Sequence, residues 1–312
     1  MNIFIVCLEA VMPIFITMLI GYASRCFGLM TEKDVRRFNA VNFKTFMPVM
    51  LFESIYSSDL ETAVNPALIA YSVVAVLLML ALCLGFVLLT EKDNSKRGVM
   101  IQGLYRSNFA LVGIPVADAL MQGGDISVVA VQLAVVVPIF NLAAVIILEG
   151  FGGKRPSIGH LLLDVVKNPL IIASALGIVF LVLDIKLPAI AATVVEDMAA
   201  VAGPLALFTL GAFFRFKGLG KYKKELLLVN CGRLIVIPGI FLTAGYLLGF
   251  RGADFAGIMG LFASCSAIAS YIMAAEMGGD AELAGNIVIS TSFLCSFTLY
   301  IWAVIFMSLG AF

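Results

Sequence analysis

Long apolar stretches alternate with short polar breaks along the whole chain. Each stretch approaches the ~20 residues that a helix needs to cross a lipid bilayer. Two helix starts are clearly marked, because Asn65-Pro66 and Asn168-Pro169 each place a capping side chain before a proline at the first helical position. The pattern predicts ten helices, at residues 3–24, 38–57, 66–90, 98–121, 126–149, 169–187, 193–214, 225–249, 253–275 and 283–308.

The composition places these helices in a membrane. Of the 312 residues, 62% are hydrophobic and 13% are charged, whereas a soluble domain is nearer half apolar and a quarter charged. A net charge of zero gives no bulk electrostatic reason to bind nucleic acid. The chain has one histidine, no CxxC pair, and no HExxH or GxSxG motif. We therefore expect an all-α protein of the lipid bilayer that is not an enzyme and binds no cofactor, metal or nucleic acid.

Lysine and arginine are distributed unequally between the two ends of the predicted helices. The loops after odd-numbered helices hold 15 of them, and the loops at the other end hold only Lys186 and Arg251. Basic residues accumulate on the cytoplasmic side of membrane proteins, so the odd-numbered loops are predicted to be cytoplasmic. With ten helices, both termini then lie outside the cytoplasm, and the protein is expected in the inner (plasma) membrane.

The sequence repeats features at half its length, which indicates two copies of a five-helix unit. Matching glycines, prolines and Gly-Gly-Asp triplets recur in the same order, 155 to 157 residues apart. The pairs are Gly21 and Gly177, Pro48 and Pro204, Gly103 and Gly260, and the triplets at 123–125 and 278–280. Five is an odd number of spans, so the second copy must be inverted in the membrane. Inverted repeats are typical of secondary transporters, which bind substrate near the midplane at interrupted helices.

The fourth predicted helix contains the strongest candidate for a binding site. Arg106, Asn108, Gly113, Ile114 and Pro115 lie close together within one apolar span. Proline lacks an N–H and clashes with the preceding turn, so we expect the helix to break at Gly113–Pro115 and to expose helix-end N–H groups to an anion. Arg106 adds a charge and a fork suited to a carboxylate. The alternative is a simple proline kink, with Arg106 reaching to the cytoplasmic face.

The ninth helix, the repeat partner of the fourth, carries small residues in place of a proline. Ser266 and Ser270 stand in the run Ala-Ser-Cys-Ser-Ala-Ile-Ala-Ser and are candidates for substrate contact, as is Asn141 of the fifth helix. Small residues also let two helices pack closely, so plain helix packing is the alternative. We expect this run to pass close to the fourth helix.

Other polar and proline residues within the spans are candidates for ion coupling or gating. They are Glu53, Asp118, Pro48 and Pro204. Ionisable groups in a membrane tend to line pathways or relay protons. Glu53 and Asp118 are alternatively solvated helix ends, and Arg233 is expected to reach toward the cytoplasmic surface.

These segments together resemble the auxin efflux carrier family, which includes the plant PIN carriers and bacterial relatives. Residues 108–115 (NFALVGIP) resemble the fourth-helix N-x-x-x-x-G-I-P of that family, and residues 106–108 resemble its bacterial R-x-N form. Residues 37–59, 203–211 and 262–280 are similar to the second, seventh and ninth helices. The resemblance covers essentially the whole chain. It departs at Ser270, where plant carriers have proline.

The resemblance implies a fold and a function. The fold is ten helices in two inverted repeats, residues 1–150 and 151–312, with the fourth and ninth helices broken and crossing. Helices 1, 2, 6 and 7 form a scaffold, and helices 3–5 and 8–10 form a transport domain. The function implied is elevator-type secondary transport of small organic anions, carboxylates such as malate, malonate or auxin-like acids. A substrate-sensing receptor or a channel on the same fold is the alternative, and a homodimer and coupling to H⁺ or Na⁺ are left open.

The charge asymmetry gives a testable topology. We expect single cysteines introduced beside Lys96 and Lys221 to react with a membrane-impermeant maleimide only when the cytoplasmic face is accessible, and a C-terminal tag to be accessible from outside. A cytoplasmic C-terminus would remove one span and contradict the inverted repeat.

Overall fold

The computed structural model describes residues 3–57, 65–121, 127–152, 167–214 and 218–312, and within these ranges the chain is predominantly helical. The repeated Gly-Gly-Asp at 123–125 lies outside the described residues. Within them no strand forms, and Ser107 and Ser266 make an isolated antiparallel β-bridge. Five helices are long and apolar enough to cross a membrane: Pro66–Thr90, Val131–Phe151, Ala189–Phe213, Lys223–Leu247 and Ala281–Ser308. The prediction of an all-α fold is thereby confirmed for the described residues, and these five helices are consistent in length and composition with membrane spans.

Helical segments occupy all ten predicted ranges. In chain order they are α1 (Ile3–Cys26), α2 (Glu32–Val41), η1 (Asn42–Phe46), α3 (Met47–Tyr56), α4 (Pro66–Thr90), α5 (Asn94–Tyr105), η2 (Phe109–Gly113), α6 (Ile114–Leu120), α7 (Ser127–Phe151), α9 (Pro169–Val182), α10 (Ala189–Phe213), α11 (Gly218–Lys221), α12 (Lys223–Cys231), η3 (Gly232–Val236), α13 (Ile237–Leu247), α14 (Gly252–Ala263), α15 (Ala269–Glu276) and α16 (Ala281–Ser308). The second predicted helix begins earlier than expected, at Glu32. The reason is a capping box, in which Thr31 and Asp34 bond each other's backbone N–H groups.

Three wide π-helical turns lie within the described part of the chain, and each ends two residues before a proline. They are η1 before Pro48, η2 before Pro115 and η3 before Pro238. Each proline lies in the first turn of the following α-helix, where its missing N–H leaves no bond unmade. The wide turn therefore accommodates the proline without breaking the chain, which is why Pro115 does not end its helix as predicted.

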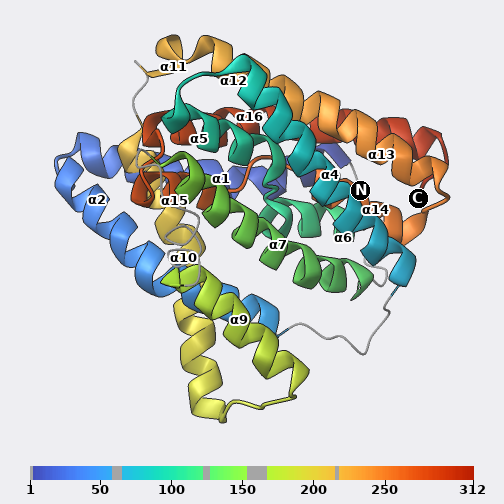
Figure 1. Cartoon of the computed structure of the whole chain (residues 1–312), viewed down its shortest axis with the longest axis horizontal. Coiled ribbons are helices and arrows are strands. Elements are labelled where there is room, and N and C mark those ends of the chain that lie inside the picture. The colour runs from blue at the N-terminus through green and yellow to red at the C-terminus, as the bar shows by residue number, and fades with distance from the viewer. Residues whose placement is uncertain (1–2, 58–64, 122–126, 153–166, 215–217) are drawn as a thin grey trace.

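One set of helices packs closely together, since α1 packs along α10, and α3 packs along both α9 and α10. α1 also packs against α16 and α6. Figure 1 shows α9 and α10 extending beyond the other helices, with α2 beside them. We call α1, α2, η1, α3, α9 and α10 the flanking group, and α4–α7 with α11–α16 the crossing group.

Glycine lets the backbones of the flanking group touch. A Cβ on Gly21 of α1 would collide with the Phe208 carbonyl of α10, and a Cβ on Gly211 of α10 would collide with the Met18 carbonyl of α1. In the same way, a Cβ on Gly177 of α9 would lie 3.1 Å from the Phe52 carbonyl of α3. Such contacts hold membrane helices together by close packing.

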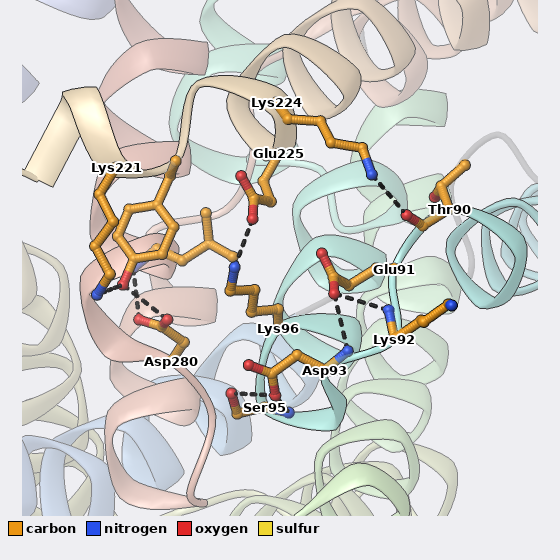
Figure 2. Close-up of polar contacts among 12 residues, drawn as sticks. Thr90, Glu91, Lys92, Asp93, Ser95, Lys96, Lys221, Lys224, Glu225 and Asp280 are labelled. Carbon is orange, nitrogen blue, oxygen red and sulfur yellow. Dashed lines mark hydrogen bonds and ion pairs between the residues drawn. The ribbon is translucent and has the colours of Figure 1, made fainter.

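One end of the crossing group is tied by charged side chains (Figure 2). The Lys96 ammonium of α5 pairs with the Glu225 carboxylate of α12 at 2.6 Å. Tyr222 donates to Asp280, the N-cap residue of α16, at 2.8 Å. The bond to Glu225 raises the pKa of Lys96, so this pair stays charged at neutral pH. The starts of α5, α12 and α16 are therefore held together at the end that the charge pattern assigns to the cytoplasm.

The packing of α1 on α10 predicts an unequal response of two glycines. Gly211→Ala is expected to destabilise the protein by about 1–3 kcal/mol, because its Cβ must push α1 away. Gly85→Ala is the matched control, since a Cβ there meets nothing within 4 Å and alanine favours a helix. Thermal unfolding in detergent measures both. Equal melting temperatures for the two variants would contradict the close contact.

Candidate functional site

Two interrupted helices cross in the middle of the crossing group. α5 ends at Tyr105 and η2 begins at Phe109, while α14 ends at Ala263 and α15 begins at Ala269. The two breaks pair with each other as a short antiparallel ladder. The Asn108 N–H donates to the Cys265 carbonyl at 2.8 Å, and the Ala267 N–H donates to the Arg106 carbonyl at 2.9 Å. The interruption of the fourth helix thus lies at Arg106–Asn108, and the prediction that placed it at Gly113–Pro115 was wrong.

Serine side chains hold the same crossing together. The Ser107 and Ser264 hydroxyls bond each other at 2.6 Å, and the Ser266 hydroxyl donates to the Gly103 carbonyl at 2.6 Å. All three serines are buried. Buried backbone groups freed by a helix break need such partners, because no water reaches them.

Arg233 completes the crossing from η3. Its side chain is fully buried, with an exposed fraction of 0%. The guanidinium donates to the carbonyls of Ser264 at 2.9 Å, Leu261 at 3.2 Å and Leu104 at 3.3 Å. These carbonyls close α5 and α14, where helix ends carry partial negative charge. Arg233 therefore joins two helix C-termini, and the expectation that it reaches toward the cytoplasmic surface was wrong.

A cavity of about 270 Å³ lies between the crossing and the flanking group. The crossing group contributes its broken segments and α7, and the flanking group contributes α3 and α10. Polar lining comes from the crossing side, and the opposite wall is apolar. The residues that matter most here are Arg106, Asn108 and Asn141 on the first side and Met47, Met50, Leu51, Ala199, Ala202 and Pro204 on the second.

Arg106 is the one charged residue that lines this cavity in the described part of the chain. Its side chain is only 4% exposed, and none of the ion pairs among the described residues includes it. Nη2 donates to Asn141 Oδ1 at 2.5 Å, and Nη1 contacts the Met273 sulfur. The Nδ2 of Asn141 is buried with no hydrogen-bond partner. A buried guanidinium and a buried amide donor thus meet at one cavity without an acceptor of full negative charge.

The remaining predicted binding residues do not line the cavity. Gly113 packs against α14, because a Cβ there would lie 2.6 Å from the Gly260 carbonyl. Ile114 is half-buried and Pro115 is exposed in α6. Ser270 is buried, and its hydroxyl has no partner in the described part of the chain. The structure therefore brings Arg106, Asn108 and Asn141 together at the cavity, whereas Gly113, Ile114, Pro115, Ser266 and Ser270 do not line it.

The predicted coupling and gating residues are more scattered. Pro204 lines the cavity from α10, a helix that passes through this proline without a break. Pro48 follows the lining residue Met47. Glu53 is half-buried in α3, Asp118 is exposed in α6, and neither lines the cavity. Any role of Glu53 or Asp118 in coupling would therefore act outside this cavity.

Sequence reasoning missed three contributions to the site. Arg233 was expected to reach the cytoplasmic surface, although an arginine in the middle of an apolar span can also indicate a buried partner. The apolar wall from α3 and α10 has no sequence signal beyond hydrophobicity. The third is a buried bond between the two groups, in which Asn39 of α2 donates to the Tyr271 hydroxyl of α15 at 3.0 Å.

Comparison with known proteins establishes the family of the chain. A family model described as "membrane transport protein" matches residues 6–303. The chain belongs to this family, that of the auxin efflux carriers. It is similar to an uncharacterized transporter of Methanothermobacter thermautotrophicus, with 23% identity over 95% of this chain and 97% of the relative. A second relative, an uncharacterized transporter of Methanocaldococcus jannaschii, is 22% identical over 92% of this chain and 94% of its own length.

For this membrane transport protein, the structure predicts that Arg233 is essential to folding. Arg233→Gln should lower the free energy of unfolding by about 3–5 kcal/mol, because buried carbonyls lose a charged donor. Arg36→Gln, on the exposed face of α2, is the matched control and should change it by about 0.5 kcal/mol or less. Thermal unfolding or monodispersity after purification provides the measurement. An Arg233→Gln protein as stable as the control would show that the crossing does not need this residue.

Proposed function

We propose that this protein is a secondary transporter of small organic anions and that Arg106 binds the anionic group. The observation that carries the proposal is the position of Arg106, a buried cation without a carboxylate partner at a cavity between two groups of helices. A buried charge is costly unless it is paired. A carboxylate entering the cavity would supply the missing partner, and the guanidinium fork suits its two oxygens.

The surroundings of Arg106 favour particular acids. Asn108 and the unpaired Nδ2 of Asn141 add neutral donors beside the guanidinium. Backbone N–H groups in the first turn of η2 also lack intrahelical partners and favour negative charge. The opposite wall offers methionine, leucine and alanine. Among carboxylates such as malate, malonate and auxin-like acids, this arrangement favours an acid with one carboxylate on a small apolar body.

We further propose that the chain consists of two inverted five-helix repeats, residues 1–150 and 151–312. The contacts support this, because residues equivalent in the two halves meet at the crossing. The side chains of Ser107 and Ser264, and those of Asn108 and Cys265, are contact pairs separated by 157 residues. In the flanking group, Gly21 meets Phe208 while its equivalent Gly177 meets Phe52. Such reciprocal contacts are expected around a pseudo-twofold axis.

Alternating access would then be an elevator movement. The flanking group corresponds to the proposed scaffold of helices 1, 2, 6 and 7, and the crossing group corresponds to the proposed transport domain. The cavity lies on the boundary between them, and the residues of its flanking wall are apolar. The crossing group would carry the anion past this wall. The proposed location is the inner (plasma) membrane with both termini outside, and a homodimer and H⁺ or Na⁺ coupling belong to the same proposal.

Substitutions at Asn108 and Arg106 test the anion site. Asn108→Ala should weaken substrate binding by roughly 1–3 kcal/mol, the cost of leaving buried polar groups unpaired. Arg106→Lys should impair transport, because an ammonium lacks the planar fork. A thermal-shift screen against organic acids identifies the ligand, and uptake into proteoliposomes under imposed H⁺ or Na⁺ gradients measures flux. The exposed Arg36→Lys serves as control.

The results separate the competing functions. Wild-type affinity and flux in folded Asn108→Ala and Arg106→Lys proteins would contradict the site. Specific binding of an acid with no flux would indicate a sensing receptor, and flux that does not saturate would indicate a channel.

A further inference from the structure

A second and larger cavity lies between α4 and the continuous helix α12–η3–α13. Its volume is about 610 Å³, and its lining is apolar apart from two cysteines. Several rim side chains are exposed, among them Leu82, Ile240 and Leu227, which is 64% exposed. Both walls belong to helices that are long and apolar enough to cross a membrane. The groove therefore opens toward lipid chains and not toward water.

Lysines gather at one end of this groove. Lys224 of α12 donates across the groove to the Thr90 carbonyl at the end of α4, at 3.0 Å (Figure 2). Lys92 lies two residues after the end of α4, and its exposed ammonium has no partner among the described residues. Lys223 is exposed beside them. The neighbouring Glu91 uses its carboxylate to accept the backbone N–H groups of Lys92 and Asp93, at 2.7 and 2.8 Å.

We propose that this groove binds an anionic phospholipid, with one acyl chain between α4 and α12–α13 and the phosphate beside Lys92 and Lys224. The lining of the second wall runs from Leu227 to Phe241, roughly 20 Å of helix at 1.5 Å per residue. One leaflet of a bilayer core is about 15 Å deep, so the groove accommodates a chain over its full depth. Lysines near the membrane surface attract anionic head groups. The proposal rests on the membrane location and does not depend on the transported substrate.

The floor of the groove connects this lipid to the crossing. Leu104 of α5 forms part of the floor, and a Cβ on Gly232 of η3 would collide with it. The Leu104 carbonyl is one of the three that accept from Arg233. An acyl chain packed on Leu104 would thus support the helix end that carries Arg106. A lipid bound in the groove is therefore expected to stabilise the folded protein.

Native mass spectrometry and thermal unfolding of the purified full chain test the proposal. The probes are dioleoyl phosphatidylglycerol, dioleoyl phosphatidylcholine and inorganic phosphate. The wild-type protein should retain phosphatidylglycerol in preference to phosphatidylcholine and melt at a higher temperature with it. Inorganic phosphate alone should change nothing, because the acyl chain supplies much of the binding.

Variants separate the head group from the groove. Lys92→Gln with Lys224→Gln should weaken phosphatidylglycerol retention by roughly tenfold, whereas Lys33→Gln on α2 is the matched control and should retain it. Cys231→Phe should fill the groove and reduce retention of the acyl chain, whereas Cys26→Phe, at another exposed cysteine, should not. The lysine pair decides the outcome if Cys231→Phe fails to fold.

Three results would overturn the proposal. The first is equal retention of phosphatidylglycerol and phosphatidylcholine by the wild-type protein. The second is stabilisation by inorganic phosphate alone, which would mean a simple anion site. The third is full phosphatidylglycerol retention in the Lys92→Gln, Lys224→Gln protein.

Discussion

The structure depends on satisfying the backbone groups that two interrupted helices leave inside an apolar protein. α5 and α14 both end at the crossing, and their last carbonyls cannot reach water. Arg233 donates to three of these carbonyls, and the serines and the short ladder satisfy others. Each unmet backbone group in such surroundings costs several kcal/mol. The broken helices are therefore stable only because a charged side chain from a third helix is buried with them.

Two buried arginines lie near this crossing, and their surroundings give them different roles. Arg233 has all three guanidinium nitrogens on carbonyl oxygens and does not line the cavity beside the crossing. Arg106 has one amide oxygen and a sulfur as neighbours, and it lines the cavity. The Arg233 guanidinium thus has a hydrogen-bond acceptor for each of its nitrogens, whereas the Arg106 guanidinium has fewer acceptors. This difference between the two arginines supports the proposed anion site at Arg106.

Contacts within the flanking group differ in kind from contacts at the boundary between the two helix groups. Within the flanking group, glycines allow backbones to touch, which fixes α1 on α10 and α3 on α9. Across the boundary, the cavity wall of α3 and α10 is apolar. A buried hydrogen bond from Asn39 to Tyr271 also crosses it. Close packing within the flanking group and an apolar cavity wall are the features on which the proposed movement of one group past the other rests.

Several properties followed from the sequence alone, because they depend on local or additive physics. Apolar run length and low charge established an all-helical membrane protein, and the motif at 106–115 led to the family. Arg106, Asn108 and Asn141 are recognisable as candidate binding residues because burying a polar group in an apolar span costs free energy. This cost can be inferred without knowing which residues are neighbours. The sequence also shows matching glycine and proline positions 156 or 157 residues apart, one in each half of the chain.

Other features were decided only by tertiary contacts. The break fell at Arg106–Asn108 and not at Pro115, because a wide turn absorbed the proline and a second chain segment paired with the open backbone. Arg233 became a structural residue because the carbonyls that it binds come from positions 28 to 129 residues away along the chain. The apolar cavity wall likewise required α3 and α10 to be brought opposite the crossing. Sequence patterns report the cost of a polar group in an apolar span, whereas only the folded chain supplies the partner that offsets it.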